Sequence, residues 1–280
     1  MLMTSPLIPP IPRDTARLAH AAFGTRNFYI QVGLNIEEIL TSIQMDIPET
    51  PDQTASHQQT ILAMVTFFQF VEGLIDEQVM DALRTRVEWK YALHYPMHPL
   101  LLNQAALCQF RQKNIHDATR LPKYQELVDQ LVRLGPPIDH KEEKFEVKHM
   151  LSTLCALNLL EFARTTFSKT IEILAIRHPN WLRQIALPYW YAPSNRSESR
   201  FDPYASIQQQ ELLWQKLGND INHLLTQIHT TGFQDIHELM EVKMLEKTWQ
   251  AQFVNWNPPS AGQNLEPKLR DCTTCFHRHP

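Results

Sequence analysis

Apolar residues recur at helical spacing through much of this sequence, and that period most constrains the fold. From Glu146 to about Arg177 the chain contains almost no helix breaker, and its apolar residues return every three or four positions. The stretch from Ile61 to Val71 has the same period. Alternating runs of β-branched residues bounded by turn residues, which are typical of paired strands, do not occur in the sequence. The sequence therefore predicts a mainly α fold with little or no sheet.

Glycine is scarce, at 7 of 280 residues, which disfavours folds that use glycine in phosphate-binding loops and tight hairpins. The sequence contains neither G-x-G-x-x-G nor G-x-x-x-x-G-K-[ST], so we expect no nucleotide-binding loop. The hydrolase motif G-x-S-x-G and the zincin motif H-E-x-x-H do not occur either.

Three features of the sequence predict a cytoplasmic protein with no membrane partner. The longest apolar stretch, around residues 61–71, is interrupted by Thr66 and Gln69 and is shorter than the ~18 residues of a membrane span. The first residues, MLMTSPLIPPIPRD, lack the basic start and long apolar run of a secretory signal. The four cysteines are too few and too unevenly spaced for a disulfide framework.

Composition and helix signals divide the chain into five regions. In order, we expect a proline-rich arm with short helices near 15–22 and 36–43 (1–56), a helix-turn-helix-like domain (57–134), a Gly-Pro-Pro linker (135–144), long helices (145–257) and a disordered tail (258–280). Within the second region, Gly73 separates two helices and Asp76 is placed to cap the second.

Charge is distributed unevenly, although the net charge is only −4. No Lys or Arg occurs between Asn27 and Leu83, a stretch that holds nine acidic residues, whereas between Arg84 and Lys123 the basic residues outnumber the acidic ones. This reversal predicts a local basic surface. The candidate phosphate contacts are Arg84, Arg86, Lys90, Arg111 and Lys113. The alternative is a solvated helix face on which arginines pair with neighbouring acids.

A specific string of residues carries a resemblance to a known family. The segment ILAMVTFFQFVEGLIDEQVMDALRTRVEWKYALHYPMHP, at 61–99, is followed by LCQFR at 107–111. It resembles the InsH-like N-terminal helical domain of bacterial insertion-sequence transposases of the DDE class. Similar short stretches near Phe23, Trp181 and Trp249 extend the resemblance over most of residues 8 to about 265. The resemblance implies DNA binding at transposon ends. It also implies that the second half of the chain corresponds to the start of an RNase H-like catalytic domain and to a helical insertion into that domain.

The resemblance also implies where catalytic acids would lie. Such transposases cleave and join DNA with acidic residues that hold two Mg²⁺ ions. The stretch that matches the first acid is Phe145-Glu146-Val147-Lys148-His149, which makes Glu146 the catalytic candidate. Glutamate carries its oxygens one methylene farther than aspartate, and Lys148 adds positive charge beside a cation site. We therefore expect Glu146 to be a poor Mg²⁺ ligand, and we expect this chain to need no cofactor.

The end of the chain departs from the family's pattern. The remaining two acids of the family follow the Pro258-Pro259 linker at a distance that this sequence does not reach, so we expect an incomplete catalytic domain. The final stretch contains four zinc-competent residues, Cys272, Cys275, His277 and His279. Their spacing, C-x₂-C-x-H-x-H, favours an unselected terminal tail over a metal site.

The sequence thus predicts a transposase-derived DNA-binding protein that does not cut DNA by itself. Two alternatives stay open: a regulator that occupies transposon ends or pairs with itself or a full-length transposase and inhibits it, and a decayed fragment without a selected role. Aromatic residues within the helical patterns are expected to be core, and Tyr189–Tyr191 are the aromatics in a predicted loop that are retained as stacking candidates.

Overall fold

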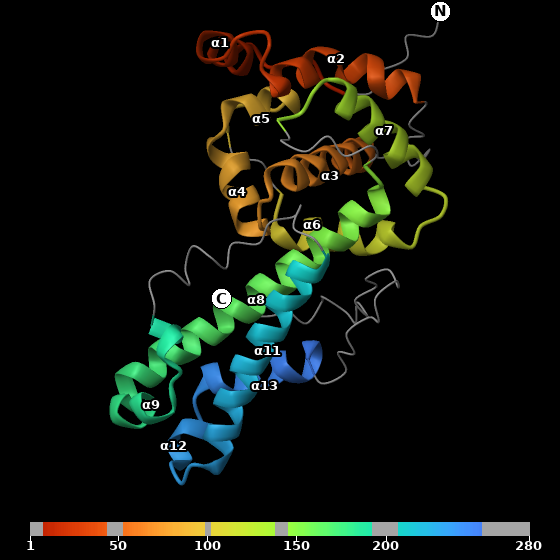
Figure 1. The fold of residues 1–280 in the computed structure, drawn as a ribbon. Helices are drawn as coiled ribbons and strands as arrows, with labels where there is room; N and C mark the ends of the chain where they lie inside the picture. Colours follow the sequence, from red (N-terminus) through yellow and green to blue (C-terminus); the bar gives the residue numbers. More distant parts are fainter. Residues whose placement is uncertain (1–7, 44–52, 99–101, 138–144, 192–206, 254–280) are drawn as a thin grey trace, which may run out of the picture. The chain divides into compact units, whose positions relative to one another are not determined.

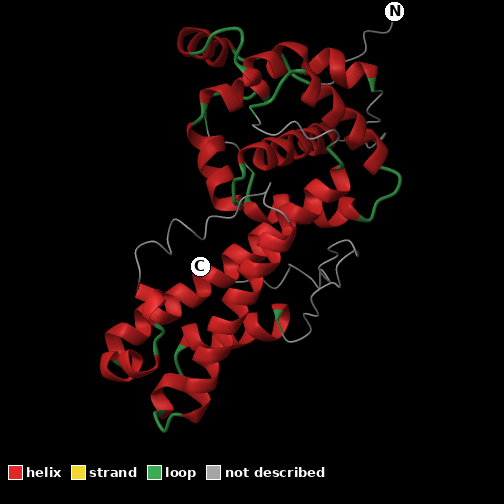
Figure 2. Cartoon of the chain, viewed as in Figure 1, coloured by secondary structure: helices red, strands yellow, loops and turns green. Residues whose placement is uncertain are grey.

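The computed structural model describes residues 8–43, 53–98, 102–137, 145–191 and 207–253, and every regular element within them is a helix. Figure 2 shows these helices joined by loops, with no strand in the described ranges. The prediction of a mainly α fold is therefore confirmed. The chain divides into two compact units, residues 1–155 and 156–280. Among the described residues, no helix combines the length and the hydropathy needed to cross a membrane.

The first unit is built from seven helices of the described chain and the start of an eighth (Figure 1). They are α1 (Arg13–Ala22), α2 (Phe28–Ser42), α3 (Gln53–Glu72), α4 (Asp76–Thr85), α5 (Val87–Ala92), α6 (Gln104–Ile115), α7 (Leu121–Arg133) and the beginning of α8 (Val147–Arg177). Helix α5 packs against both α1 and α2, and α6 packs against α3 and α4. Residues 1–56, predicted as an arm, thus contribute α1 and α2 to the packing of this unit.

Local sequence explains where several helices begin and end. The side chain of Asn27 accepts hydrogen bonds from the backbone of Tyr29 and Ile30 and so begins α2. Helix α3 ends at Gly73, whose φ of 63° is the left-handed conformation that glycine adopts without steric cost. Asp76 is the first residue of α4 rather than its cap, and its carboxylate bonds to the guanidinium of Arg111.

The core of the first unit is aromatic. Phe67, Phe68 and Trp89 are fully buried, and the rings of Phe68 and Trp89 lie 5.3 Å apart between centroids. Tyr29 of α2 packs edge-on against Phe68 at 5.0 Å. These contacts join α2, α3 and α5 in one aromatic core.

His94 closes α5 in an unusual way. Its φ is 53°, and the backbone N–H of Tyr95 bonds to the carbonyl of Lys90, as in helices that end with glycine. Its ring nitrogens lie 2.7 Å from the carbonyl oxygens of Pro9 and Gly33. Because carbonyl oxygens only accept hydrogen bonds, both contacts are hydrogen bonds when both ring nitrogens carry a proton. The ring thereby joins the N-terminal segment and α2 to the end of α5.

The second unit contains the rest of α8 and five further elements. They are α9 (Pro179–Ile185), the 3₁₀ helix η1 (Pro188–Tyr191), α11 (Ile207–Thr230), α12 (Gln234–His237) and α13 (Met240–Gln252). Its core combines buried residues from α8, α11 and α13, among them Leu174, Ile221 and Val242. Gly218 allows close packing here, since a Cβ at this position would lie 2.9 Å from the ring of Phe253.

Candidate nucleic-acid interface

Arg111, one of the five candidate phosphate contacts, lies inside the first unit. It is 1% exposed, and its guanidinium donates hydrogen bonds of 2.9 and 2.6 Å to the two carboxylate oxygens of Asp76. It also donates to Oε1 of Gln69 at 3.0 Å. Burial opposes the charge of Arg111, but the Asp76 carboxylate outweighs it and raises the pKa of the guanidinium. In this structure Arg111 joins α6 to α3 and α4 and does not reach solvent.

Arg86 is likewise engaged in a network within the first unit. Its guanidinium forms ion pairs with Glu72 and Glu88 and lies over the rings of Tyr29 and Trp89, at 5.3 and 5.0 Å from their centroids. Glu72 also accepts hydrogen bonds from the Tyr29 hydroxyl and, at 3.2 Å, from Nε1 of Trp89. Burial and then the neighbouring Glu72 carboxylate raise the pKa of Tyr29. We call this set of five residues the Glu72 cluster.

Lys90, like Arg111, lies in the interior of the first unit. It is 2% exposed, and its ammonium donates a hydrogen bond of 2.7 Å to the carbonyl oxygen of Met97. Burial lowers the pKa of Lys90. The hydrogen bond holds the segment after α5 and leaves the ammonium unable to contact a phosphate in this conformation.

Arg84 and Lys113 are the two candidates that lie at the surface. Arg84 forms an ion pair of 2.7 Å with Asp81, one turn earlier on α4, and both side chains are more than half exposed. Such surface pairs contribute little stability and exchange readily for other partners. Lys113 is exposed near the end of α6. Both cations can therefore reach a ligand in solvent.

Other exposed cations that the sequence analysis did not select lie near the N-terminus. Arg13 and Arg17 are exposed on α1, and Arg26 is exposed in the loop that follows. The four-residue spacing of the first two, which places them on one helix face, is the sequence signal that could have found them.

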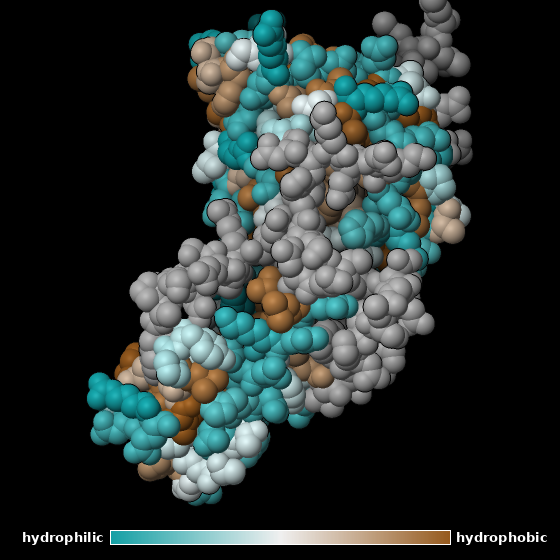
Figure 3. Space-filling view, in the orientation of Figure 1, coloured by the Kyte–Doolittle hydropathy of each residue, from teal (hydrophilic) through white to brown (hydrophobic). Residues whose placement is uncertain are grey.

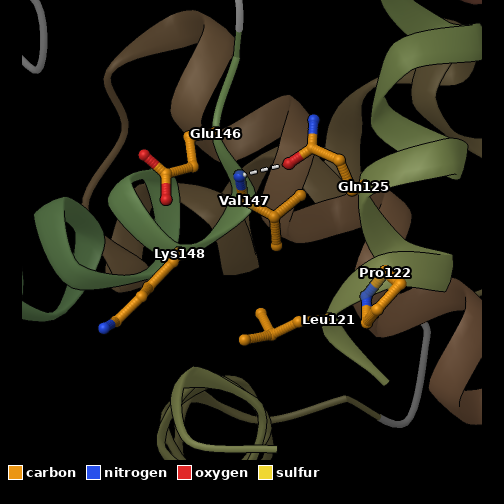
Figure 4. A pocket seen from close by; sticks show the side chains of 6 residues that line it. All are labelled: Leu121, Pro122, Gln125, Glu146, Val147 and Lys148. Carbon is orange, nitrogen blue, oxygen red and sulfur yellow. Dashed lines mark hydrogen bonds between the residues drawn. The ribbon is translucent and has the colours of Figure 1, made fainter. Parts of the chain in front are cut away.

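Glu146, the catalytic candidate, is exposed immediately before α8 and lines a shallow pocket of about 220 Å³ (Figure 4). Gln125 of α7 fixes the local backbone, because its amide oxygen accepts from the Val147 N–H at 2.9 Å and its amide nitrogen donates to the carbonyl of Phe145. Figure 4 shows the Glu146 carboxylate and the Lys148 ammonium on the same side of the helix start.

This pocket does not fit Mg²⁺, the ion that the resemblance implies. Magnesium requires near-octahedral oxygen ligands, usually one or two carboxylates with water. The lining residues supply the Glu146 carboxylate and the Gln125 amide oxygen, but that oxygen is occupied by the Val147 N–H. Lys148 adds a positive charge to the same lining. The lining of this pocket therefore does not provide the oxygen ligands that a Mg²⁺ ion would need.

The remaining sequence candidates have different outcomes. Within the described ranges, no group of three or more His, Cys, Asp or Glu residues is placed to hold a metal ion. Cys272, Cys275, His277 and His279 lie outside those ranges. Of the aromatic residues retained as stacking candidates, Tyr189 donates a hydrogen bond to buried Asp220, and the Trp190 ring packs on Phe167 and His223. Trp190 thus packs against the core of the second unit, whereas Tyr189 is bonded to Asp220 but stays 37% exposed.

Comparisons with protein-family models, with curated proteins and with solved structures find no match for this chain.

Proposed function

We propose that the chain is a transposase-derived DNA-binding protein of an insertion sequence, and that it does not cut or join DNA by itself. The observation that supports the first part is the Glu72 cluster. Its members come from the stretches that carry the family resemblance, yet Tyr29 and Glu72 are 43 positions apart in the chain. Stretches that carry the resemblance thus meet in one partly buried network, which favours their belonging to one fold over their being separate chance strings.

The surface cations provide the chemistry for DNA binding. Phosphate contacts require cations that reach solvent, and Arg84 and Lys113 satisfy this condition. Arg86, Lys90 and Arg111 contribute instead to the fold that carries them. We therefore expect mutation of the surface pair to weaken DNA binding, and mutation of buried Lys90 or Arg111, or of partly buried Arg86, to lower stability.

The pocket beside Glu146 supports the second part of the proposal. Its lining supplies one exposed carboxylate, that of Glu146, together with the cationic side chain of Lys148, whereas two-metal chemistry needs several acidic oxygens around a shared site. The role of Glu146 is accordingly structural: its backbone carbonyl oxygen accepts a hydrogen bond of 2.9 Å from the Met150 N–H at the start of α8.

DNA binding is tested by fluorescence anisotropy with short labelled duplexes that tile the DNA on both sides of the gene. We expect one or more of them to bind more tightly than shuffled duplexes, with an affinity that falls steeply as salt rises from ~50 to ~200 mM. Equal, salt-independent signals for all duplexes would contradict the proposal. In a second assay, specific nicking of the bound duplex in Mg²⁺ or Mn²⁺ would refute the absence of strand cleavage.

A second candidate function is inhibition of a full-length transposase through hetero-oligomers. It is favoured by exposed apolar residues of the second unit: Ile176, Leu212 and Met240 are 76%, 64% and 67% exposed. Figure 3 shows hydrophobic residues, in brown, among hydrophilic ones on the face in view. Sedimentation of the protein alone and with a full-length transposase encoded in the same genome tests this candidate, which a lack of co-sedimentation would eliminate.

A further inference from the structure

Three exposed arginines at the N-terminal end of the first unit have few acidic neighbours in the chain. Arg13 and Arg17 lie one turn apart on α1, and Arg26 lies in the loop between α1 and α2. Asp14 is the single acidic residue between positions 8 and 36. Its carboxylate lies 3.4 Å from Arg17, with both side chains about four-fifths exposed, so the pair is weak.

Helix α1 holds Arg13 and Arg17 on a fixed support. The Thr15 hydroxyl donates a hydrogen bond of 2.8 Å to the carbonyl oxygen of Tyr95, and Ala19 is fully buried in a cluster with Ile30 and Tyr91. Thr15 and Ala19 lie one turn apart and define the inner face of α1. Arg13 and Arg17, which are exposed, lie on a different face of the same helix.

The polarity of α1 strengthens the positive field at this surface. The helix begins at Arg13, and Pro12 before it provides no side-chain cap. A cation in the first turn is unfavourable for the helix itself, because the N-terminal end of a helix already carries partial positive charge. Arg13 therefore does not serve the stability of α1, whereas its charge and the helix end act together on an approaching anion.

The packing partner of α1 adds no opposing charge at the surface. Helix α5 contains one acidic residue, Glu88, which is buried and forms an ion pair of 2.6 Å with Arg86. The acidic residues of α2, Glu37 and Glu38, follow ten or more residues after Arg26, in the second half of that helix. The exposed residues of α1 and of the loop that follows it thus include three arginines, Arg13, Arg17 and Arg26, against one acid, Asp14, and we call this basic region the α1 surface.

We propose that the α1 surface contacts the phosphate backbone of duplex DNA, an inference that rests on the DNA-binding function proposed above. Exposed arginines on a helix whose opposite face is buried can contact DNA phosphates. Such contacts position a protein on DNA without reading the base sequence. The surface differs from the region between Arg84 and Lys123, where the charge pattern of the sequence predicts the interface. A phosphate contact at the α1 surface would give a role to the basic residues that precede the acidic stretch between Asn27 and Leu83, in addition to those that follow it.

The test compares three forms of the full-length chain: wild type, the triple variant Arg13→Gln, Arg17→Gln, Arg26→Gln, and a matched control. The control, Lys169→Gln, Arg177→Gln, Arg183→Gln, removes the same number of charges from exposed positions of α8 and α9. Each form is titrated with a labelled duplex of random sequence at several salt concentrations. Circular dichroism verifies that each form retains its helix content, and Arg26→Gln alone provides a loop substitution that leaves α1 intact.

We expect the triple variant to reduce the slope of log affinity against log salt by about 2.7, and the single variant by about 0.9, since each lost phosphate contact removes about 0.9. The control keeps the wild-type slope. If the wild type binds with a salt-dependent affinity and the triple variant retains its slope, the α1 surface is not the interface and the proposed function stands. If the wild type shows no salt-dependent binding, both proposals fail.

Discussion

Asp76 and Arg111 are 35 positions apart in the chain, yet two hydrogen bonds of 2.9 and 2.6 Å join their side chains inside the first unit. The pair connects the first turn of α4 to the middle of α6, and Gln69 of α3 bonds to both side chains. Three helices therefore depend on one buried ion pair.

Removing one partner of this pair should be strongly destabilising. Arg111→Met leaves the Asp76 carboxylate buried without its cation, so we expect the free energy of unfolding to fall by about 3–5 kcal/mol. Urea denaturation followed by circular dichroism measures the change. The double variant Asp76→Leu, Arg111→Met removes both charges and should recover part of the loss. Equal stability of Arg111→Met and wild type would contradict the importance of the pair.

The raised pKa of Tyr29 predicts a loss of stability in alkali. Because the folded protein holds the phenol proton more tightly than the unfolded chain, stability is unaffected below pH ~10, the pKa of an unfolded tyrosine, and falls as pH rises above it. Tyr29→Phe should be less stable at neutral pH, because Glu72 loses a donor, but should lose less additional stability between neutral and alkaline pH. Identical pH slopes for the two proteins would refute the role of Tyr29.

Substitutions at His94 separate backbone strain from the contacts of its ring. His94→Ala loses both ring contacts and keeps the left-handed backbone, whereas His94→Gly loses the contacts and relieves the strain. We expect the order of stability to be wild type, then His94→Gly, then His94→Ala, with about 1–2 kcal/mol between the two variants. Thermal unfolding measures all three. Equal stability of His94→Ala and wild type would show that the ring contacts contribute nothing, and a glycine variant more stable than wild type would show that relief of strain outweighs them.

A methyl group at Gly33 should disrupt the packing of α2 on α5. A Cβ there would lie 2.6 Å from a ring carbon of Tyr91 and 2.8 Å from its carbonyl oxygen. We expect Gly33→Ala to lower the free energy of unfolding by about 1–3 kcal/mol or more. Gly24→Ala is the matched control, since nothing lies within 4 Å of a Cβ at that position. The two variants should differ clearly in urea midpoint, and similar midpoints would count against close packing at Gly33.

Much of the helical structure could be predicted because its causes are local. The apolar period around Ile61 to Val71 indicates α3, and a glycine that ends a helix is visible at Gly73. The start of α2 is different: the period predicts a helix near 36–43, whereas the helix begins at Phe28. Asn27 is recognisable in the sequence as a cap residue. Gly33, however, interrupts the helical pattern, and only the structure shows that it lies within the helix, where it allows close contact with Tyr91.

The placement of the candidate site residues could be predicted less well, because charge counts treat each cation as exposed. Arg111 and Arg86 are held by Asp76 and Glu72, which belong to other helices. An available signal was the acid-rich stretch before Arg84, since neighbouring runs of opposite charge can neutralise one another within a fold. Which acid meets which cation depends on tertiary packing, so the charge pattern alone could not separate surface cations from buried ones.

The boundary between the two compact units falls inside α8, which runs from Val147 to Arg177 while the first unit ends at Cys155. A fragment cut at Cys155 would end within a helix and leave its last four carbonyl groups without their intrahelical donors. An expression fragment of the first unit should therefore include further turns of α8. For the same reason, deleting one half of the gene does not isolate the function of that half, because the deletion also shortens helix α8 in the half that remains.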